Sequence, residues 1–397
     1  MSVQEGFAEP TGQDRDRSPL LGTPTDAEGP IRLAYLDGLR ALAAGYVVLF
    51  HAFPGFLAPQ LIGPWRLFKR AFAYGHEAVA IFIVLSGYCL MLPLVRKDPA
   101  RLQIAFGRFV KRRAKRILPP YFAAVVGSMA LLASVPLLRR SGSGTIWDDS
   151  LPGLEPGSLV SHALVVHNWF PKYAYQLNGP LWSVASEWQI YFFFPLVLLP
   201  LWRRLGMPGA LLGAAALGYA PLWFAPAGAR VAIPWYLLLF TFGMAAASIG
   251  FAFHELERRL RTRVAWGWLS GGLWLACVVF SNVAATLWFS LKPLVDPLIG
   301  LSTAALLTHL TRQGIAGRRS RLLTLLESPP LVALGHFSYS LYLTHLPVLA
   351  LCYFGLRGLK LSGASLMLGL PLLGGLASLV VAYAFHLVFE RPFMKRA

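Results

Sequence analysis

The sequence is poor in charged residues, which excludes a protein that water solvates along most of its length. Asp, Glu, Lys and Arg make up 14% of the chain, against about 25% in soluble domains. Hydrophobic residues make up 56%. A net charge of +18 would indicate nucleic-acid binding in a soluble chain, but here we attribute it to membrane topology and expect no nucleic-acid partner. The composition predicts an integral membrane protein.

Cysteine is scarce as well, and its spacing excludes two kinds of site. The three cysteines, Cys89, Cys277 and Cys352, lie in apolar stretches without C-x-x-C spacing or a nearby His partner. Neither a zinc site nor a disulfide framework is therefore expected. We expect these residues to be small apolar fillers.

What the chain has in abundance is long apolar stretches. Windows of about twenty apolar residues recur between polar or Pro/Gly breaks, and each is long enough to cross a bilayer as a helix. This pattern predicts an all-α, polytopic membrane protein with about ten transmembrane helices. The expected spans are 36–56, 76–95, 117–138, 180–202, 206–225, 232–252, 264–289, 293–311, 331–354 and 364–389.

Basic residues are distributed unevenly over the connections between these spans. If alternate connections lie on opposite sides, one side carries 25 of the 36 Lys and Arg residues. The positive-inside rule then places both termini in the cytoplasm. Residues 1–30 contain six acidic residues and no apolar run, which favours a disordered cytoplasmic tail over a signal peptide. We expect residues 31–391 to form the transmembrane domain and 392–397 a second cytoplasmic tail.

Two ionisable side chains share one face of the first span. Arg40 and His51 are eleven residues apart, which in a helix is three turns plus about 20° and a separation of about 16 Å. An ionisable residue at membrane depth indicates a functional site. This pair suggests a reaction path that crosses the bilayer.

The rise per residue also gives a depth to polar residues of other spans. His51 lies about 22 Å from the inner end of its span, and Ser86, Glu187 and His345 fall at similar depth near the outer boundary. We therefore expect these four side chains to share one layer. Structural alternatives remain: a hydrogen-bonded packing role for His345, a structural carboxylate at Glu187, and close packing of helices at Ser86.

A basic stripe precedes the third span. In GRFVKRRAKRILPPY, residues 107–121, helical spacing gathers the basic side chains on one face. Such a stripe can anchor the chain to anionic lipid headgroups. It can equally bind a donor that carries several phosphates, and both roles can hold at once.

Five segments, in order, resemble the acyltransferase 3 family of membrane O-acyltransferases. Arg40 and His51 match its Arg/Lys-x10-His signature, and the five segments together extend the resemblance over about residues 31–391. They are LDGLRALAAGYVVLFH at 36–51, FIVLSGY at 82–88, RRAKRILPPYF at 112–122, LWSVASEWQIYFFFP at 181–195 and SYSLYLTHLPV at 338–348.

The resemblance implies ten transmembrane helices and transfer of an acyl group, commonly acetyl, from acyl-coenzyme A to a hydroxyl of a sugar-containing acceptor. It implies no metal, and we expect the protein in a bacterial inner or plasma membrane. His51 is the expected general base, or forms an acyl-histidine, and Glu187 the group that orients it. The expected coenzyme-binding residues are Arg40, Asp37, Arg112, Arg113 and Arg116, and further site residues are Ser86, Trp182, Ser183, Tyr191, Tyr339 and His345.

One departure from the family pattern bears on the acceptor. Trp188 follows Glu187 where many members have a second carboxylate, which resembles the branch that acts on antibiotic sugars and similar small acceptors. A surface glycan, a lipid-linked sugar and a glycosylated metabolite, such as a macrolide sugar, all remain open. The acceptor is expected to enter from outside, under the connection at 139–179, where residues 159–170 predict a short helix at the membrane surface.

A transporter or flippase is the rival hypothesis, because many spans and buried polar residues would give a similar composition. Transporters often contain paired interrupted helices in two corresponding halves. The sequence shows no such internal symmetry. We therefore favour the enzyme over the carrier.

Overall fold

The structure is a computed structural model, and it describes residues 33–58, 62–95, 104–225, 227–251, 254–283 and 288–394. Within these ranges the regular elements are all helices, which confirms the expected all-α class. This is the physical consequence of the apolar composition, because a helix satisfies its own backbone hydrogen bonds where no water is present. The expected tail at 1–30 and the last three residues lie outside the described residues.

Eight helices of the described part are long and apolar enough to cross a membrane, and a ninth span results if one pair bent by 73° counts as a single crossing. One of the eight, Leu181–Phe224, runs for 44 residues, or about 66 Å, twice the thickness of a bilayer core. Gly206 interrupts it with φ 67°, a conformation that glycine adopts readily. This stretch is long enough for two crossings, and its break lies at the boundary between the expected spans at 180–202 and 206–225.

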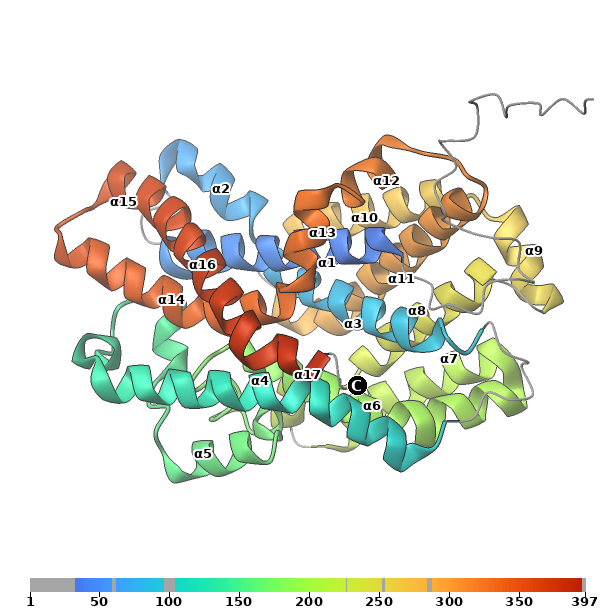
Figure 1. The fold of residues 1–397 in the computed structure, drawn as a ribbon, viewed down its shortest axis with the longest axis horizontal. Helices are drawn as coiled ribbons and strands as arrows, with labels where there is room; N and C mark the ends of the chain where they lie inside the picture. The colour runs from blue at the N-terminus through green and yellow to red at the C-terminus, as the bar shows by residue number, and fades with distance from the viewer. Residues whose placement is uncertain are drawn as a thin grey trace, which may run out of the picture.

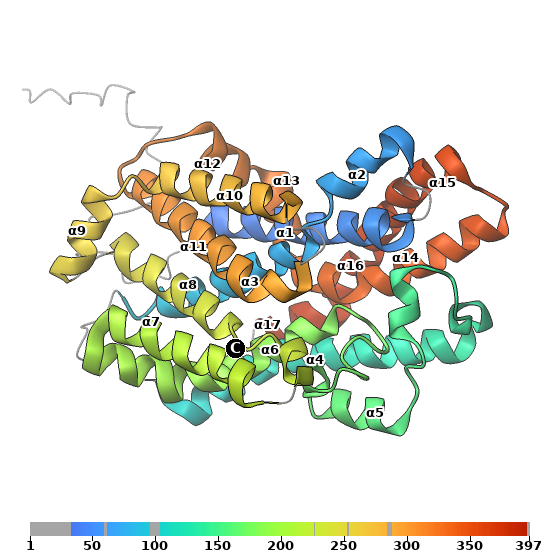
Figure 2. The same ribbon diagram turned by 180° about the vertical axis from the view of Figure 1, so that it is seen from behind.

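The long helices run roughly along one axis of the molecule (Figures 1 and 2). Short helices lie beyond their ends: α2 and α15 at one end and α9 at the other (Figure 1). The principal helices are α1 (Ala34–Phe50), α3 (Gly75–Met91), α4 (Phe106–Ser134), α6 (Leu181–Phe193), α7 (Leu199–Phe224), α8 (Tyr236–Phe251), α10 (Trp266–Val283), α11 (Trp288–Ile315), α14 (Ser338–Gly358) and α16 (Gly375–Phe385). The shorter ones are α2 (Arg66–Ala71), α5 (Pro156–Ala163), α9 (Glu255–Arg263), α12 (Arg321–Leu326), α13 (Pro329–His336), α15 (Gly363–Gly369) and α17 (Arg391–Met394).

Helices α3 and α8 form the centre of the bundle, and glycine lets their backbones approach closely. A β-carbon at Gly87 would overlap the carbonyl oxygen of Phe240, and one at Gly243 would overlap that of Val84. Small residues at such crossings are typical of helix packing in membranes. The expected close packing beside Ser86 is therefore confirmed at its neighbour Gly87.

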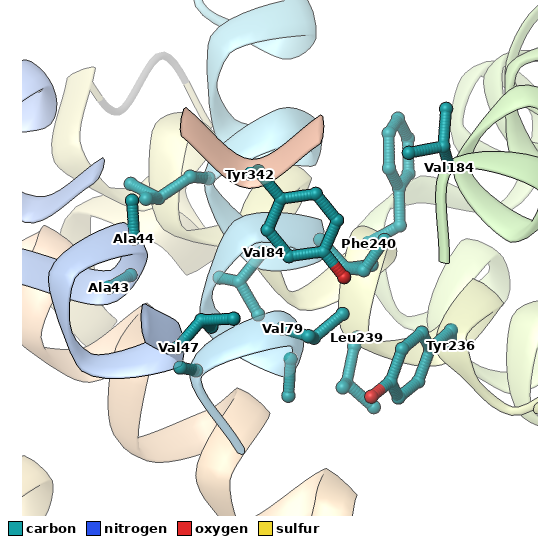
Figure 3. Close-up of a cluster of buried hydrophobic side chains, with 14 of the residues drawn as sticks. Ala43, Ala44, Val47, Val79, Val84, Val184, Tyr236, Leu239, Phe240 and Tyr342 are labelled. Carbon is teal, nitrogen blue, oxygen red and sulfur yellow. The ribbon is translucent and has the colours of Figure 1, made fainter. Parts of the chain in front are cut away.

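The amount of buried surface separates central from peripheral spans. In the most apolar window of Arg230–Phe251, 83% of the residues are buried, whereas in that of Gly363–Met394 only 22% are. The second segment is also the more hydrophobic of the two, so its exposed face suits lipid rather than water. Figure 3 shows part of the central packing, where side chains of α1, α3, α6 and α8 meet Tyr342 of α14.

A π-helical turn, wider than an α-helical one, follows α1 and begins at His51, which is expected to be functional. Residues His51–Phe56 form a π-helical turn that contains Pro54. Proline has no N–H and cannot bond the carbonyl of Phe50 one turn earlier, and the chain continues with a wider bond from the N–H of Leu57 to the carbonyl of Ala52 (3.2 Å). Widened turns of this kind often occur at functional sites.

The connection at 139–179 contains the predicted short helix, although it starts earlier than expected. Helix α5 covers Pro156–Ala163 and lies beside α4 in both views (Figures 1 and 2). His162 and His167 are fully buried in this region, with their rings stacked 3.9 Å apart. The histidines are therefore part of the packing of this connection and do not face solvent.

Candidate active site

A cavity of about 190 Å³ lies among α1, α3, α4, α6 and α14. Along α3 its wall extends from Leu90 to Val79, a distance of about 16 Å. It therefore runs along the spans and not across them. Its charged Arg, Asp and Glu lining residues are Arg40, Arg113, Arg116, Asp37, Glu187 and Glu390.

Arg40 is held at this cavity by two partners. Its guanidinium donates one hydrogen bond to Asp37 Oδ1 (2.7 Å) and another to Cys89 Sγ (2.9 Å). Asp37 in turn lies 3.6 Å from the imidazole of His336. The expectation that Cys89 is only an apolar filler is wrong, because its sulfur accepts a hydrogen bond from Arg40 and lines the cavity.

Only part of the basic stripe of α4 lines the cavity. Arg113 and Arg116 line the cavity, whereas Arg112 does not. The guanidinium of Arg113 lies over the ring of Phe109, 5.8 Å from its centroid, and its Nε is buried without a hydrogen-bond partner. A buried donor without a partner is costly, so this atom fits an anionic ligand in the cavity.

Ser86 and Glu187 meet at Tyr191, inside the same cavity. The phenol of Tyr191 donates a short hydrogen bond to Glu187 Oε1, and Ser86 Oγ lies 2.8 Å from the same phenol oxygen. Three of the residues singled out from the sequence therefore form one chain of hydrogen bonds across α3 and α6. Ser183 and Tyr339 also line this cavity.

His51 and His345 form a second group, at the widened end of α1. His345 Nε2 lies 3.2 Å from His51 Nδ1, and both residues are buried. Nδ1 of His51 lies 2.8 Å from the carbonyl oxygen of Val47, and Nδ1 of His345 lies 3.0 Å from that of Leu341. Each ring is thus fixed by the preceding turn of its own helix.

These contacts determine which ring nitrogens carry protons. A carbonyl oxygen only accepts hydrogen bonds, so Nδ1 is the protonated nitrogen in both rings. His345 Nε2 is then an acceptor, and it faces the Nδ1–H that His51 also directs at Val47. This leaves a lone pair on His51 Nε2, as a general base requires.

The expected layer of four side chains therefore separates into two groups. His51 contacts His345, whereas Glu187 is bound to Tyr191, so the structure gives the orienting position beside His51 to His345 and not to Glu187. The expected depths of the four side chains were similar. They separate because α6 presents Glu187 to α3 and α4. Neither histidine lines the cavity.

Tyr342 links the two groups. It lines the cavity, and its ring centroid lies 5.9 Å from that of His345. Its phenol oxygen lies 2.7 Å from Ser183 Oγ and donates to the carbonyl of Pro180 (3.1 Å). Figure 3 shows this ring between side chains of α1 and those of α6 and α8.

Two buried carboxylates, Glu390 and Asp296, were not among the residues predicted from the sequence. Glu390 lines the cavity and accepts hydrogen bonds from Ser340 (2.5 Å) and from His386 Nδ1 (2.8 Å). Asp296, fully buried, accepts from His76 Nε2 (3.1 Å) and Trp235 Nε1 (2.7 Å). The rise per residue would give a depth for both carboxylates, but neither lies in the five segments that resemble the family.

Trp182 of the LWSVASE segment packs against the pair formed by His76 and Asp296. The ring of His76 stacks on Trp182, with centroids 5.6 Å apart and an interplanar angle of 15°. Glu77, next to His76, is buried with no hydrogen-bond partner for either carboxylate oxygen. Trp182 is therefore a packing partner of a buried His–Asp pair, and it is absent from the cavity wall.

Comparison with known proteins identifies the family of the chain. The family model described as an acyltransferase domain matches residues 33–387. The acyltransferase MdmB of Streptomyces mycarofaciens is 28% identical over 399 residues, which cover 92% of this chain and 92% of MdmB. No solved structure matches.

A second relative matches over a shorter range. The O-acetyltransferase OatA of Staphylococcus aureus is 27% identical over 186 residues, which cover 44% of this chain. The match spans only 26% of OatA. Similarity to OatA is therefore confined to part of each protein.

Proposed function

From the premise that the chain belongs to the acyltransferase domain family, and is thus a membrane O-acyltransferase, we propose that it moves an acetyl group from acetyl-coenzyme A to a hydroxyl of a sugar-containing acceptor. The observation that carries the proposal is the position of His51. Its Nδ1–H is held by Val47 and faces His345, which leaves the Nε2 lone pair for the acceptor hydroxyl.

The donor occupies the arginine-lined cavity in this proposal. Arg40, Arg113 and Arg116 bind the phosphates of coenzyme A at the arginine-rich end, and the unpartnered Nε of Arg113 is one of the donors. Asp37 holds Arg40 in place and does not itself contact phosphate, because two anions would repel. The pantetheine arm follows the cavity along α3 toward Tyr342.

The chemical step takes place where the arm ends. His51 Nε2 removes the proton of the acceptor hydroxyl while its oxygen attacks the thioester carbonyl. The C–S bond then breaks, the acyl group stays on the acceptor oxygen, and the proton passes to the thiolate of coenzyme A. His345 Nε2 accepts from the Nδ1–H of His51 and so stabilises the charged ring. An acyl-histidine intermediate would use the same Nε2 lone pair.

Replacement of His51 tests the proposal. Since general base catalysis contributes about 10²- to 10⁴-fold, we expect His51→Ala to lower kcat by that factor while the protein still binds coenzyme A. The assay follows labelled acetyl-coenzyme A and a panel of glycosides with purified protein. Thermal stabilisation by coenzyme A reports binding separately.

A matched control replaces His309, an imidazole of α11 that does not line the arginine-rich cavity. His309→Ala is expected to keep activity. Full activity of His51→Ala would reject the general base. Saturable uptake of the glycoside by vesicles, without labelled product, would instead favour the rival transporter or flippase.

A further inference from the structure

A second cavity, of about 630 Å³, lies where α9 turns into α10 beside the C-terminal end of α11. It shares no lining residue with the arginine-rich cavity described above. Its wall includes Trp266, Trp268, His309, Arg312, Gln313 and Arg318. It lies at the end of α11 where the chain continues into a further run of arginines, at 318, 319 and 321.

The charge of this cavity differs from that of the first one. Arg312 and Arg318 line it, and no Asp or Glu is among its described lining residues. Arg312 is held at the wall by a hydrogen bond to the carbonyl of Val264 (3.3 Å). The first turn of α10, at the helix N-terminus, also lines the cavity, at Trp266–Trp268; the N–H of Trp266 donates to the carbonyl of Val264 (3.0 Å), so a ligand could use only the N–H groups that follow it. Two arginines beside such a terminus favour a phosphate group.

Exposed apolar side chains of α10 lie beside this cavity. Trp268, which lines the cavity, is 87% exposed, and Trp274, Leu275 and Val279 continue the exposed face of α10. In a helix that crosses a membrane, such a face contacts acyl chains, and tryptophan is enriched at the level of lipid headgroups. The cavity thus joins an anion-binding wall to a lipid-facing helix.

We propose that this cavity binds the headgroup of an anionic phospholipid. The phosphate contacts Arg312 and Arg318, and the acyl chains lie along the exposed face of α10. A soluble phosphate would use the arginines alone and would leave the apolar face of α10 without a role. The inference is independent of acyl transfer, because none of these residues takes part in the proposed reaction.

The test compares lipids on the purified protein in detergent. Native mass spectrometry measures retention of phosphatidylglycerol against phosphatidylcholine. Basic residues near anionic lipid strengthen its binding, so Arg312→Gln combined with Arg318→Gln should lower retention of phosphatidylglycerol about thirtyfold. The matched control is Arg203→Gln with Arg204→Gln, which removes two exposed arginines from α7 and should leave retention unchanged.

Wild-type protein provides a second measurement that does not depend on folding of the variant. Phosphatidylglycerol should raise the melting temperature, whereas phosphatidylcholine and glycerol phosphate at equal concentration should not. Equal stabilisation by glycerol phosphate would overturn the lipid in favour of a free phosphate. Equal retention of both lipids by the wild type, or unchanged retention of phosphatidylglycerol by the double variant, would also overturn the proposal.

Discussion

The histidine pair and the arginine-lined cavity hold their functional groups in different ways. His51 and His345 are each fixed by a carbonyl of their own helix, at Val47 and Leu341, and meet with no carboxylate between them. In the cavity, Arg40 depends on side chains, at Asp37 and Cys89. The imidazoles of the histidine pair are therefore positioned by backbone carbonyls, whereas the guanidinium of Arg40 is positioned by side chains.

The two regions suit different tasks. A base that must meet its substrate in one orientation benefits from a ring locked by the backbone. A site for several phosphates needs long cationic side chains that move with the ligand. Three carboxylates accompany the three arginines of the cavity, so an anionic ligand would compete with these carboxylates for the arginines.

After His51 itself, the largest effect should come from the partner imidazole. His345→Ala removes the acceptor that faces Nδ1–H of His51, and we expect kcat to fall about 10- to 100-fold, part of the general base contribution. The donor KM should stay unchanged, because His345 does not line the cavity. Steady-state kinetics with acetyl-coenzyme A separate the two constants.

A conservative variant distinguishes positioning from packing. Glutamine keeps an oxygen acceptor in place of the ring nitrogen, so His345→Gln should recover most of the rate lost in His345→Ala. If both variants lose the same activity, or if the donor KM rises, His345 does not position His51. The distinction between the histidine pair and the arginine-lined cavity would then be wrong.

The cavity should respond in the opposite manner. Arg40→Ala removes one charge-assisted contact to the donor, and we expect its KM to rise about tenfold with kcat nearly unchanged. Arg112→Ala is a matched control from the same basic stripe as Arg113, because Arg112 does not line the cavity. If Arg40→Ala and the wild type had the same donor KM, Arg40 would not be a phosphate ligand.

The smallest effect concerns the connection at 139–179, whose buried histidines contrast with His51 and His345. Burial lowers the pKa of His162, and burial together with the neighbouring His162 lowers the pKa of His167 well below its usual value. Both rings are therefore neutral in the folded connection. As pH falls below about 6.5, the unfolded chain takes up protons that the folded one refuses, so stability falls.

The loss should be about 1 kcal/mol per histidine between pH 6.5 and 5.5. Hydrogen exchange of residues 156–170 at pH 7.5 and 5.5 measures it, and His162→Gln should reduce the difference. Protection factors, which correct for the pH dependence of the intrinsic exchange rate, would be equal at both pH values if these rings titrated as they do in the unfolded chain.

Much of the site could be predicted from the sequence because a helix has a fixed rise and turn. Arg40 belongs to the cavity and His51 to the layer beyond it, as their spacing along one helix indicated. The neighbours of these residues were harder to predict. Depth along a span is one coordinate, and Glu187 shares the depth of His51 while facing Tyr191 and α3.

The sequence by itself determined that the chain is a helical, polytopic membrane protein and that it resembles the acyltransferase family. Apolar length and the local geometry of a helix are properties of consecutive residues. Only the tertiary structure decided that His345 and not Glu187 meets His51, that Cys89 contacts Arg40, and that Glu390 lines the cavity. These contacts depend on which faces of the helices pack together, and that choice is made by side chains far apart in the chain.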